Sequence, residues 1–80
     1  MKFTIKNNKM ARFIALTDVH DTKRWYRAKT ITKVGPLERM NGFTVEFLQE
    51  CGLNSCVRFK NWDILAVKEE VDEIMENIQR

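Results

Sequence analysis

The sequence predicts one small domain over residues 1–80, of the α+β class and mainly β. Short apolar runs of strand length, turn residues between them and one amphipathic helical stripe near the C-terminus support this class. We expect a strongly curved antiparallel sheet of about five strands, forming a small barrel or half-barrel, with one C-terminal helix across a face or open end. Eighty residues leave room for a single core, and a hydrophobic fraction of 44% argues against disorder.

The first half of the chain contains two predicted strands. Residues 12–17 are a short apolar run that ends at a polar turn beginning with Asp18. Residues 23–34 are rich in β-branched and aromatic side chains, which favours a second strand with a bend. Gly35-Pro36 marks the end of this segment, because proline donates no backbone hydrogen bond. We place an additional edge strand at residues 3–5.

The second half begins with a predicted meander. Asn41-Gly42 is a tight-turn signal, and apolar and polar residues alternate over residues 43–48, the clearest strand pattern in the chain. Residues 55–59 and 64–67 follow as two further strands, separated by short polar turns. Three strands joined in this way form an antiparallel meander.

A helix is predicted from about residue 68 to residue 79. Acidic residues fill its first turns, where the positive end of the helix dipole favours them. Its apolar residues recur with helical spacing on one face, so the helix needs the sheet or a partner subunit to bury them. These apolar residues are Val71, Ile74, Met75 and Ile78.

Charge is divided unevenly along the chain. Residues 1–40 carry ten Lys and Arg against three Asp and Glu, or +7, and residues 41–80 carry four against eight, or −4. A cationic half selects anionic partners through its long-range field. The basic half therefore directs the search for a binding surface.

The densest basic segment spans residues 23–29 and combines four cations with two large aromatics. Strand alternation would place Trp25 on the same face as Lys23, Arg27 and Lys29, an arrangement suited to phosphates and stacked bases. In the alternative interpretation Tyr26 faces the core with Ala28, and Trp25 covers the barrel rim. The candidate residues for binding an anionic partner are Lys23, Arg24, Trp25, Arg27 and Lys29.

Trp62 is a second candidate, because it occupies a turn in which small or polar residues are usual. A large aromatic at a turn tip either folds back over the core or contacts a partner protein, where tryptophan is a frequent anchor. Both interpretations stay open from the sequence.

Catalysis, metal binding and cofactor binding are not expected. His20 is the only histidine, three glycines provide no phosphate-binding loop, and nothing places Cys51 or Cys56 beside a base. Both cysteines are expected to stay thiols, and a disulfide across the turn that they bracket is the alternative. Because no apolar segment has the length of a signal peptide or a membrane span, we expect a cytoplasmic protein with no membrane partner.

Residues 57–78, a strand, an Asn-containing turn, a strand and a helix that begins near Val67-Lys68-Glu69, resemble the ending of FlbD-type small bacterial proteins. Phe13-Ile14-Ala15-Leu16-Thr17 is similar to their opening strand. In this chain Trp62 replaces the turn glycine usual in that pattern. The resemblance implies a non-enzymatic, regulatory bacterial or phage protein and assigns no functional residue.

Three functional hypotheses follow. The first is a non-enzymatic regulatory module that binds nucleic acid or a nucleotide through the basic segment. The second is a protein-interaction module that uses Trp62 and the apolar stripe of the helix. The third is a homo-oligomer in which the cationic half of one subunit meets the anionic half of the next.

Overall fold

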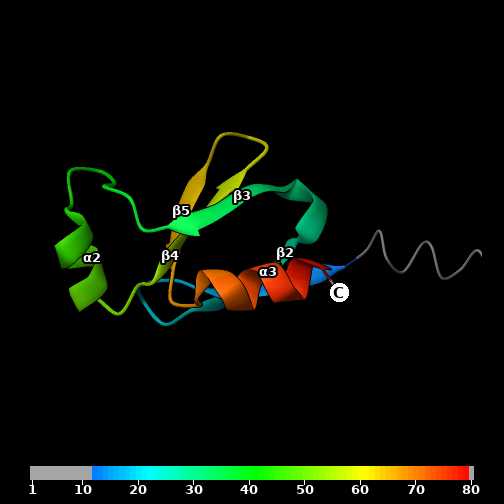
Figure 1. The fold of residues 1–80 in the computed structure, drawn as a ribbon, viewed down its shortest axis with the longest axis horizontal. Coiled ribbons are helices and arrows are strands. Elements are labelled where there is room, and N and C mark those ends of the chain that lie inside the picture. The colour runs from blue at the N-terminus through cyan, green and yellow to red at the C-terminus, as the bar shows by residue number, and fades with distance from the viewer. Residues whose placement is uncertain (1–11, 80) are drawn as a thin grey trace, which may run out of the picture.

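The computed structural model describes residues 12–79, and the edge strand predicted at residues 3–5 lies outside this range. Within this range, five strands, a short 3₁₀ turn and two helices follow one another (Figure 1). Their bounds are β1 Phe13–Thr17, β2 Lys23–Arg27, η1 Ala28–Thr30, β3 Ile31–Pro36, α2 Val45–Glu50, β4 Ser55–Phe59, β5 Ile64–Val67 and α3 Val71–Gln79. The α+β, mainly β class is confirmed, as is the C-terminal helix.

The strands form two antiparallel sheets, whereas a single curved sheet was expected. β1 pairs with β2, and β4 lies between β3 and β5 in the second sheet. The strands of the described range do not close into a barrel. The two sheets are separate because the predicted strand at residues 23–34 is interrupted by η1, which turns the chain from the first sheet into the second.

The bend at η1 is fixed by hydrogen bonds from distant segments. The Ala28 amide donates to the Arg12 carbonyl at 3.0 Å, and the Lys60 amide donates to the Thr30 carbonyl at 2.8 Å. Locally, the Thr30 hydroxyl donates to the Arg27 carbonyl at 2.7 Å. The position of the bend therefore depends on both neighbouring sheets.

The strand prediction at residues 43–48 is wrong, because this segment forms helix α2. Thr44 caps the helix by accepting a hydrogen bond from the Phe47 amide at 3.1 Å. Gly52, with a φ of 90°, ends it, and the Leu53 amide donates back to the Leu48 carbonyl. Leu48 and Leu53 are both buried, and Figure 1 shows the short helix at one end of the molecule, apart from the strands.

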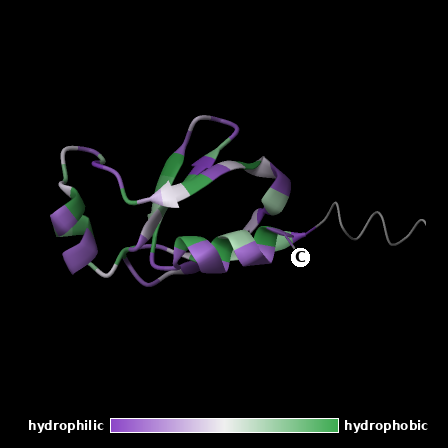
Figure 2. Cartoon of the chain, in the orientation of Figure 1, coloured by the Kyte–Doolittle hydropathy of each residue, from purple (hydrophilic) through white to green (hydrophobic). Residues whose placement is uncertain are grey.

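The core lies between the two sheets and α3. Its buried centre receives side chains from β1, β4, β5 and α3, namely Ile14, Leu16, Val57, Val67 and Ile74. Hydrophobic and hydrophilic bands alternate along α3 (Figure 2), and the helix contacts β1 and β3. Ile74 is fully buried and Ile78 packs against the core. Two residues of the apolar stripe of α3, Ile74 and Ile78, are thus used within the chain, whereas Val71 and Met75 stay partly exposed.

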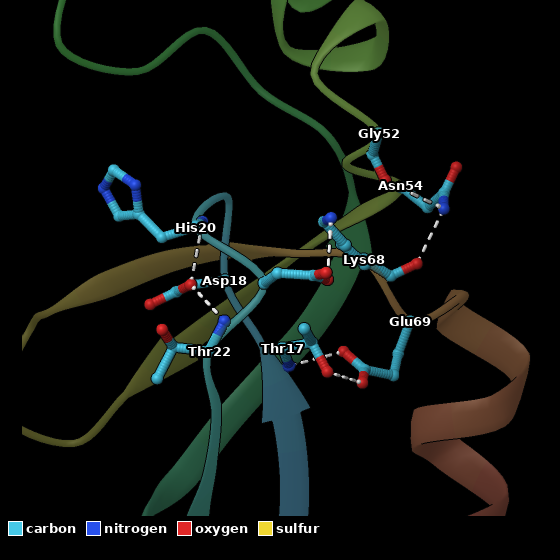
Figure 3. A network of polar contacts seen from close by, with 9 residues as sticks. Thr17, Asp18, His20, Thr22, Gly52, Asn54, Lys68 and Glu69 are labelled. Atoms are coloured by element: carbon cyan, nitrogen blue, oxygen red, sulfur yellow. Dashed lines mark hydrogen bonds and ion pairs between the residues drawn. The ribbon is translucent and has the colours of Figure 1, made fainter.

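The segment between β5 and α3 joins the two sheets. The Glu69 carboxylate accepts hydrogen bonds from the Thr17 amide at 2.8 Å and the Thr17 hydroxyl at 2.7 Å (Figure 3). The Lys68 amide donates to the Thr17 carbonyl, and the Ser55 hydroxyl donates to the Glu69 carbonyl. Because each of these groups is partly or fully shielded from water, we expect the contact to stabilise the docking of β1 onto β5.

No helix within residues 12–79 is long and apolar enough to cross a membrane.

Both cysteines are free thiols, and burial raises the pKa of the Cys56 thiol. The Cys56 sulfur accepts from the Glu38 amide at 3.4 Å and lies 3.6 Å from the Met40 sulfur, so it packs as a core residue.

Candidate nucleic-acid interface

The β1–β2 hairpin has two faces that differ in burial. In its register Ile14 faces Tyr26 and Leu16 faces Arg24, and Ile14, Leu16 and Tyr26 belong to the core or pack against it. The residues between them point to the opposite face, because successive strand side chains alternate. We call this opposite face the β1–β2 outer face; its cross-strand pairs are Phe13 with Arg27, Ala15 with Trp25, and Thr17 with Lys23.

Two aromatic rings and two cations share the β1–β2 outer face. Trp25 is 65% exposed and Phe13 is 46% exposed. The Arg27 guanidinium lies over the Phe13 ring, 5.4 Å from its centroid, in a cation–π arrangement. Lys23, also exposed, stands at the other end of the strand.

Trp25 and Phe13 are diagonal neighbours, since Phe13 pairs with Arg27 two residues along from Trp25. Such diagonal positions lie roughly 7–8 Å apart, within reach of large side chains. A surface cavity of about 340 Å³ lies beside them and is lined by both rings together with Arg12 and Asn77. The outer face therefore combines flat apolar surfaces with a hollow bordered by polar groups.

The hairpin is held at both ends. At its turn, the Asp18 carboxylate accepts from the amides of His20 at 2.9 Å and Thr22 at 3.0 Å (Figure 3). The Thr22 hydrogen bond is the main reason that the pKa of Asp18 lies below its ordinary value. At the open end, the Arg12 guanidinium donates to the Ile78 carbonyl at 2.9 Å, at the C-terminus of α3.

Three of the five predicted binding residues meet on one face. Lys23, Trp25 and Arg27 all belong to the β1–β2 outer face. Arg24 is exposed but pairs with Leu16 on the other side of the hairpin, and Lys29 lies in η1, beyond the regular alternation of β2. Tyr26 and Ala28 pack against the core, as the alternative interpretation of this segment required, but Trp25 is open to solvent and no closed barrel forms for it to cover.

Phe13 was not among the predicted binding residues. The sequence of residues 13–17 is an apolar run and does not show which side chains face outward; the structure buries Ile14 and Leu16, which leaves Phe13 on the opposite face. What the sequence did not provide was the pairing of Phe13 with Arg27, which joins it to the basic strand.

Trp62 forms a separate exposed feature on the β4–β5 turn. It is 91% exposed and has a φ of 73°, the left-handed region that bulky residues rarely adopt. The turn is closed by a hydrogen bond from the Trp62 amide to the Phe59 carbonyl and by one from the Asp63 amide to the Asn61 side chain. The interpretation in which Trp62 folds back over the core is wrong.

No protein-family model, curated protein or solved structure matches this chain. The FlbD-type resemblance therefore stays a prediction, and function is inferred from the residues and their geometry.

Proposed function

We propose that this protein is a non-enzymatic module that binds single-stranded nucleic acid through the β1–β2 outer face. The observation that carries the proposal is the exposed indole of Trp25, placed between Lys23 and Arg27 on one strand and diagonal to the exposed ring of Phe13. A regulatory role agrees with the FlbD-type resemblance.

The chemistry of the face favours a single strand. Exposed aromatic rings bind bases by stacking, which contributes about 1–3 kcal/mol per base, and bases within a duplex are not accessible for it. Lys23 and Arg27 would neutralise phosphates and release counterions. Two diagonal rings can accept two neighbouring bases of an extended strand.

Binding of a fluorescently labelled oligothymidylate, followed by anisotropy, tests the proposal. We expect Trp25→Ala to weaken binding about tenfold to a hundredfold, as the loss of one stacked base predicts. Trp62→Ala, which removes the other exposed indole, is the matched control and should leave the affinity unchanged. Affinity should also fall steeply as salt rises. Absence of binding at low salt, or equal losses for the two variants, would reject the proposal.

A protein-interaction module anchored by Trp62 is the second candidate. The observation in its favour is that Trp62 is both exposed and held in a left-handed backbone conformation. Such a residue neither fills the core nor suits its turn, so its use would lie in a partner. Crosslinking in cells separates the candidates: Trp62→Ala should abolish the crosslinked complex, and charge reversal at Arg27 should leave it nearly intact.

A homo-oligomer is the third candidate. Here the cationic half of one subunit meets the anionic half of the next, in a head-to-tail contact that forms rings or filaments. Sedimentation at low and high salt tests it, because screening should dissociate an assembly held by opposite charges. A monomer under both conditions would exclude this candidate.

A further inference from the structure

The end strands of a sheet usually carry protection against pairing with other chains. β2 has basic residues at three of its five positions, Lys23, Arg24 and Arg27. β3 contains Pro36 and a register irregularity between Ile31 and Lys33. β1 lies against α3.

β5 differs from the other end strands. It pairs with β4 on one side only, and no described strand pairs with its other edge. Its sequence, Ile-Leu-Ala-Val, has no charge and no proline, and its register with β4 is regular. Because backbone groups of alternate residues point to opposite edges of a strand, Ile64 and Ala66 present their amides and carbonyls along this edge. The edge ends at Lys68, whose amide donates to the Thr17 carbonyl of β1.

Two cavities border the unprotected edge, and we call them together the β5 groove. One, of about 430 Å³, extends toward the first sheet and includes Tyr26 and Thr30 in its lining. The other, of about 600 Å³, extends toward α2 and includes Phe47 and Leu48. Ile64 and Leu65 line both cavities, so the edge lies where the cavities meet.

From this arrangement we infer that the β5 groove binds an extended segment of a partner protein, which adds to β5 as a further strand. Strand addition supplies main-chain hydrogen bonds to the unpaired edge, and side chains that alternate along the segment enter the two cavities in turn. Apolar side chains match the linings, which include Phe59 in one cavity and Phe43 and Leu53 in the other.

The charged residues that line the two cavities favour one orientation of the bound segment and a basic residue at one of its ends. Asp18 lines the cavity toward α2, and none of the Lys and Arg residues within 12–79 lines that cavity. Its hydrogen bonds from the Thr22 and His20 amides keep the carboxylate ionised. The other cavity contains both Lys60 and Asp63. The preferred segment therefore carries a basic residue at the end that reaches Asp18.

A single segment fits the groove better than the edge of a second folded copy. The β1–β2 turn, with Val19 and His20, and helix α2 both line the larger cavity. A second sheet would have to pass between these two walls, whereas one extended strand is narrower. The lining of the β5 groove does not include Lys23, Trp25 or Arg27, so the groove is independent of the proposed nucleic-acid interface.

Two synthetic peptides test the inference on the full chain. The first alternates valine and isoleucine, so that apolar side chains face both cavities, and has a terminal lysine; the second has the same side chains with alternate backbone amides methylated, which removes donors without changing side-chain chemistry. We expect the first peptide to bind and to slow amide hydrogen exchange within β5, and the methylated peptide to bind at least about tenfold more weakly. Equal binding of both, or no binding of either, overturns the inference.

A pair of protein variants provides an independent readout. Ala66→Lys places a charge on the unprotected edge and should weaken binding of the first peptide about tenfold. Thr32→Lys, on β3 at the opposite end of the same sheet, is the matched control and should bind normally. Equal affinities of the two variants overturn the inference, as does self-association of the unmodified protein that Ala66→Lys abolishes. If Ala66→Lys does not fold, the peptide pair still decides.

Discussion

The β1–β2 and β4–β5 hairpins each present one exposed tryptophan, but in different backbone settings. Trp25 lies within a strand, where a side chain on the outer face needs no unusual backbone. Trp62 lies at a turn with a φ of 73°, a conformation that destabilises a residue with a Cβ by about 1–2 kcal/mol. An exposed tryptophan on a strand is by itself no evidence of a binding site. The proposal that Trp25 binds nucleic acid therefore depends on its neighbours Phe13, Lys23 and Arg27. At Trp62 the left-handed backbone disfavours a residue with a side chain, and this unusual position is the observation behind the alternative proposal of a partner contact.

The largest expected effect concerns the link between the two hairpins. Glu69→Ala removes the acceptor for both the Thr17 amide and the Thr17 hydroxyl. We expect the free energy of unfolding to fall by about 2–3 kcal/mol, because hydrogen bonds to a charged group are strong and the Thr17 amide loses its partner. Urea denaturation measures this change. Glu70→Ala, at the neighbouring exposed position, should lose less than about 1 kcal/mol; similar losses would mean that the hairpins dock without this contact.

Phe13→Ala tests whether the β1–β2 outer face acts as a two-ring surface. Phe13 is half exposed, and its ring is covered on one side by the Arg27 guanidinium. We expect oligonucleotide affinity to fall about tenfold, near the lower end of the stacking range, with little change in stability. Anisotropy and urea denaturation measure the two quantities. An unchanged affinity would mean that Phe13 does not take part in binding. Trp25 would then be a single exposed ring, as Trp62 is, and the two hairpins would no longer differ in this respect.

Trp62→Gly and Trp62→Ala separate backbone strain from the side chain. Glycine relieves the left-handed strain but adds unfolded-state entropy, so we expect a net gain of about 0.5–1 kcal/mol for Trp62→Gly. Alanine keeps the Cβ and should give no gain. Thermal or urea unfolding of both variants provides the measurement. If Trp62→Gly destabilises the protein, the indole has a structural role and the contrast between the hairpins fails.

Arg27→Gln tests the electrostatic part of the proposed interface. Removal of one phosphate contact should reduce the slope of log affinity against log salt by about one, as counterion release predicts. Anisotropy titrations at several salt concentrations measure the slope. Arg39→Gln, which changes an exposed cation outside the β1–β2 outer face, is the control and should leave the slope unchanged.

The smallest expected effect is on the acid stability of the β1–β2 turn. Because the folded state lowers the pKa of Asp18, its carboxylate stabilises the fold above the unfolded pKa, and this contribution is lost as pH falls through the folded value. Between about pH 5 and pH 2 the unmodified protein should therefore lose more stability than Asp18→Asn, whose amide oxygen still accepts the turn hydrogen bonds. Parallel pH curves for the two proteins would contradict this prediction.

Local patterns predicted most of the secondary structure. Strand signals at residues 13–17, 55–59 and 64–67 and the stripe of α3 each depend on neighbours in sequence, and all four elements form. α2 was predicted as a strand because six residues satisfy both periods. Its helical signals, a Thr44 cap and a Gly52 stop, were present, but the burial of Leu48 and of Leu53 was not visible from the sequence.

By itself the sequence determined the α+β class, the concentration of cations in the first half and the alternation that separates Trp25 from Tyr26. These properties follow from composition and from periods of two or 3.6 residues. Only the tertiary structure decided that the strands form two sheets, that Phe13 joins Trp25 and Arg27, and that none of the strands within residues 12–79 pairs with the second edge of β5. Each of these depends on contacts between residues far apart in the chain, such as Arg12 with Ala28 or Thr17 with Glu69, whose pairing no local pattern specifies.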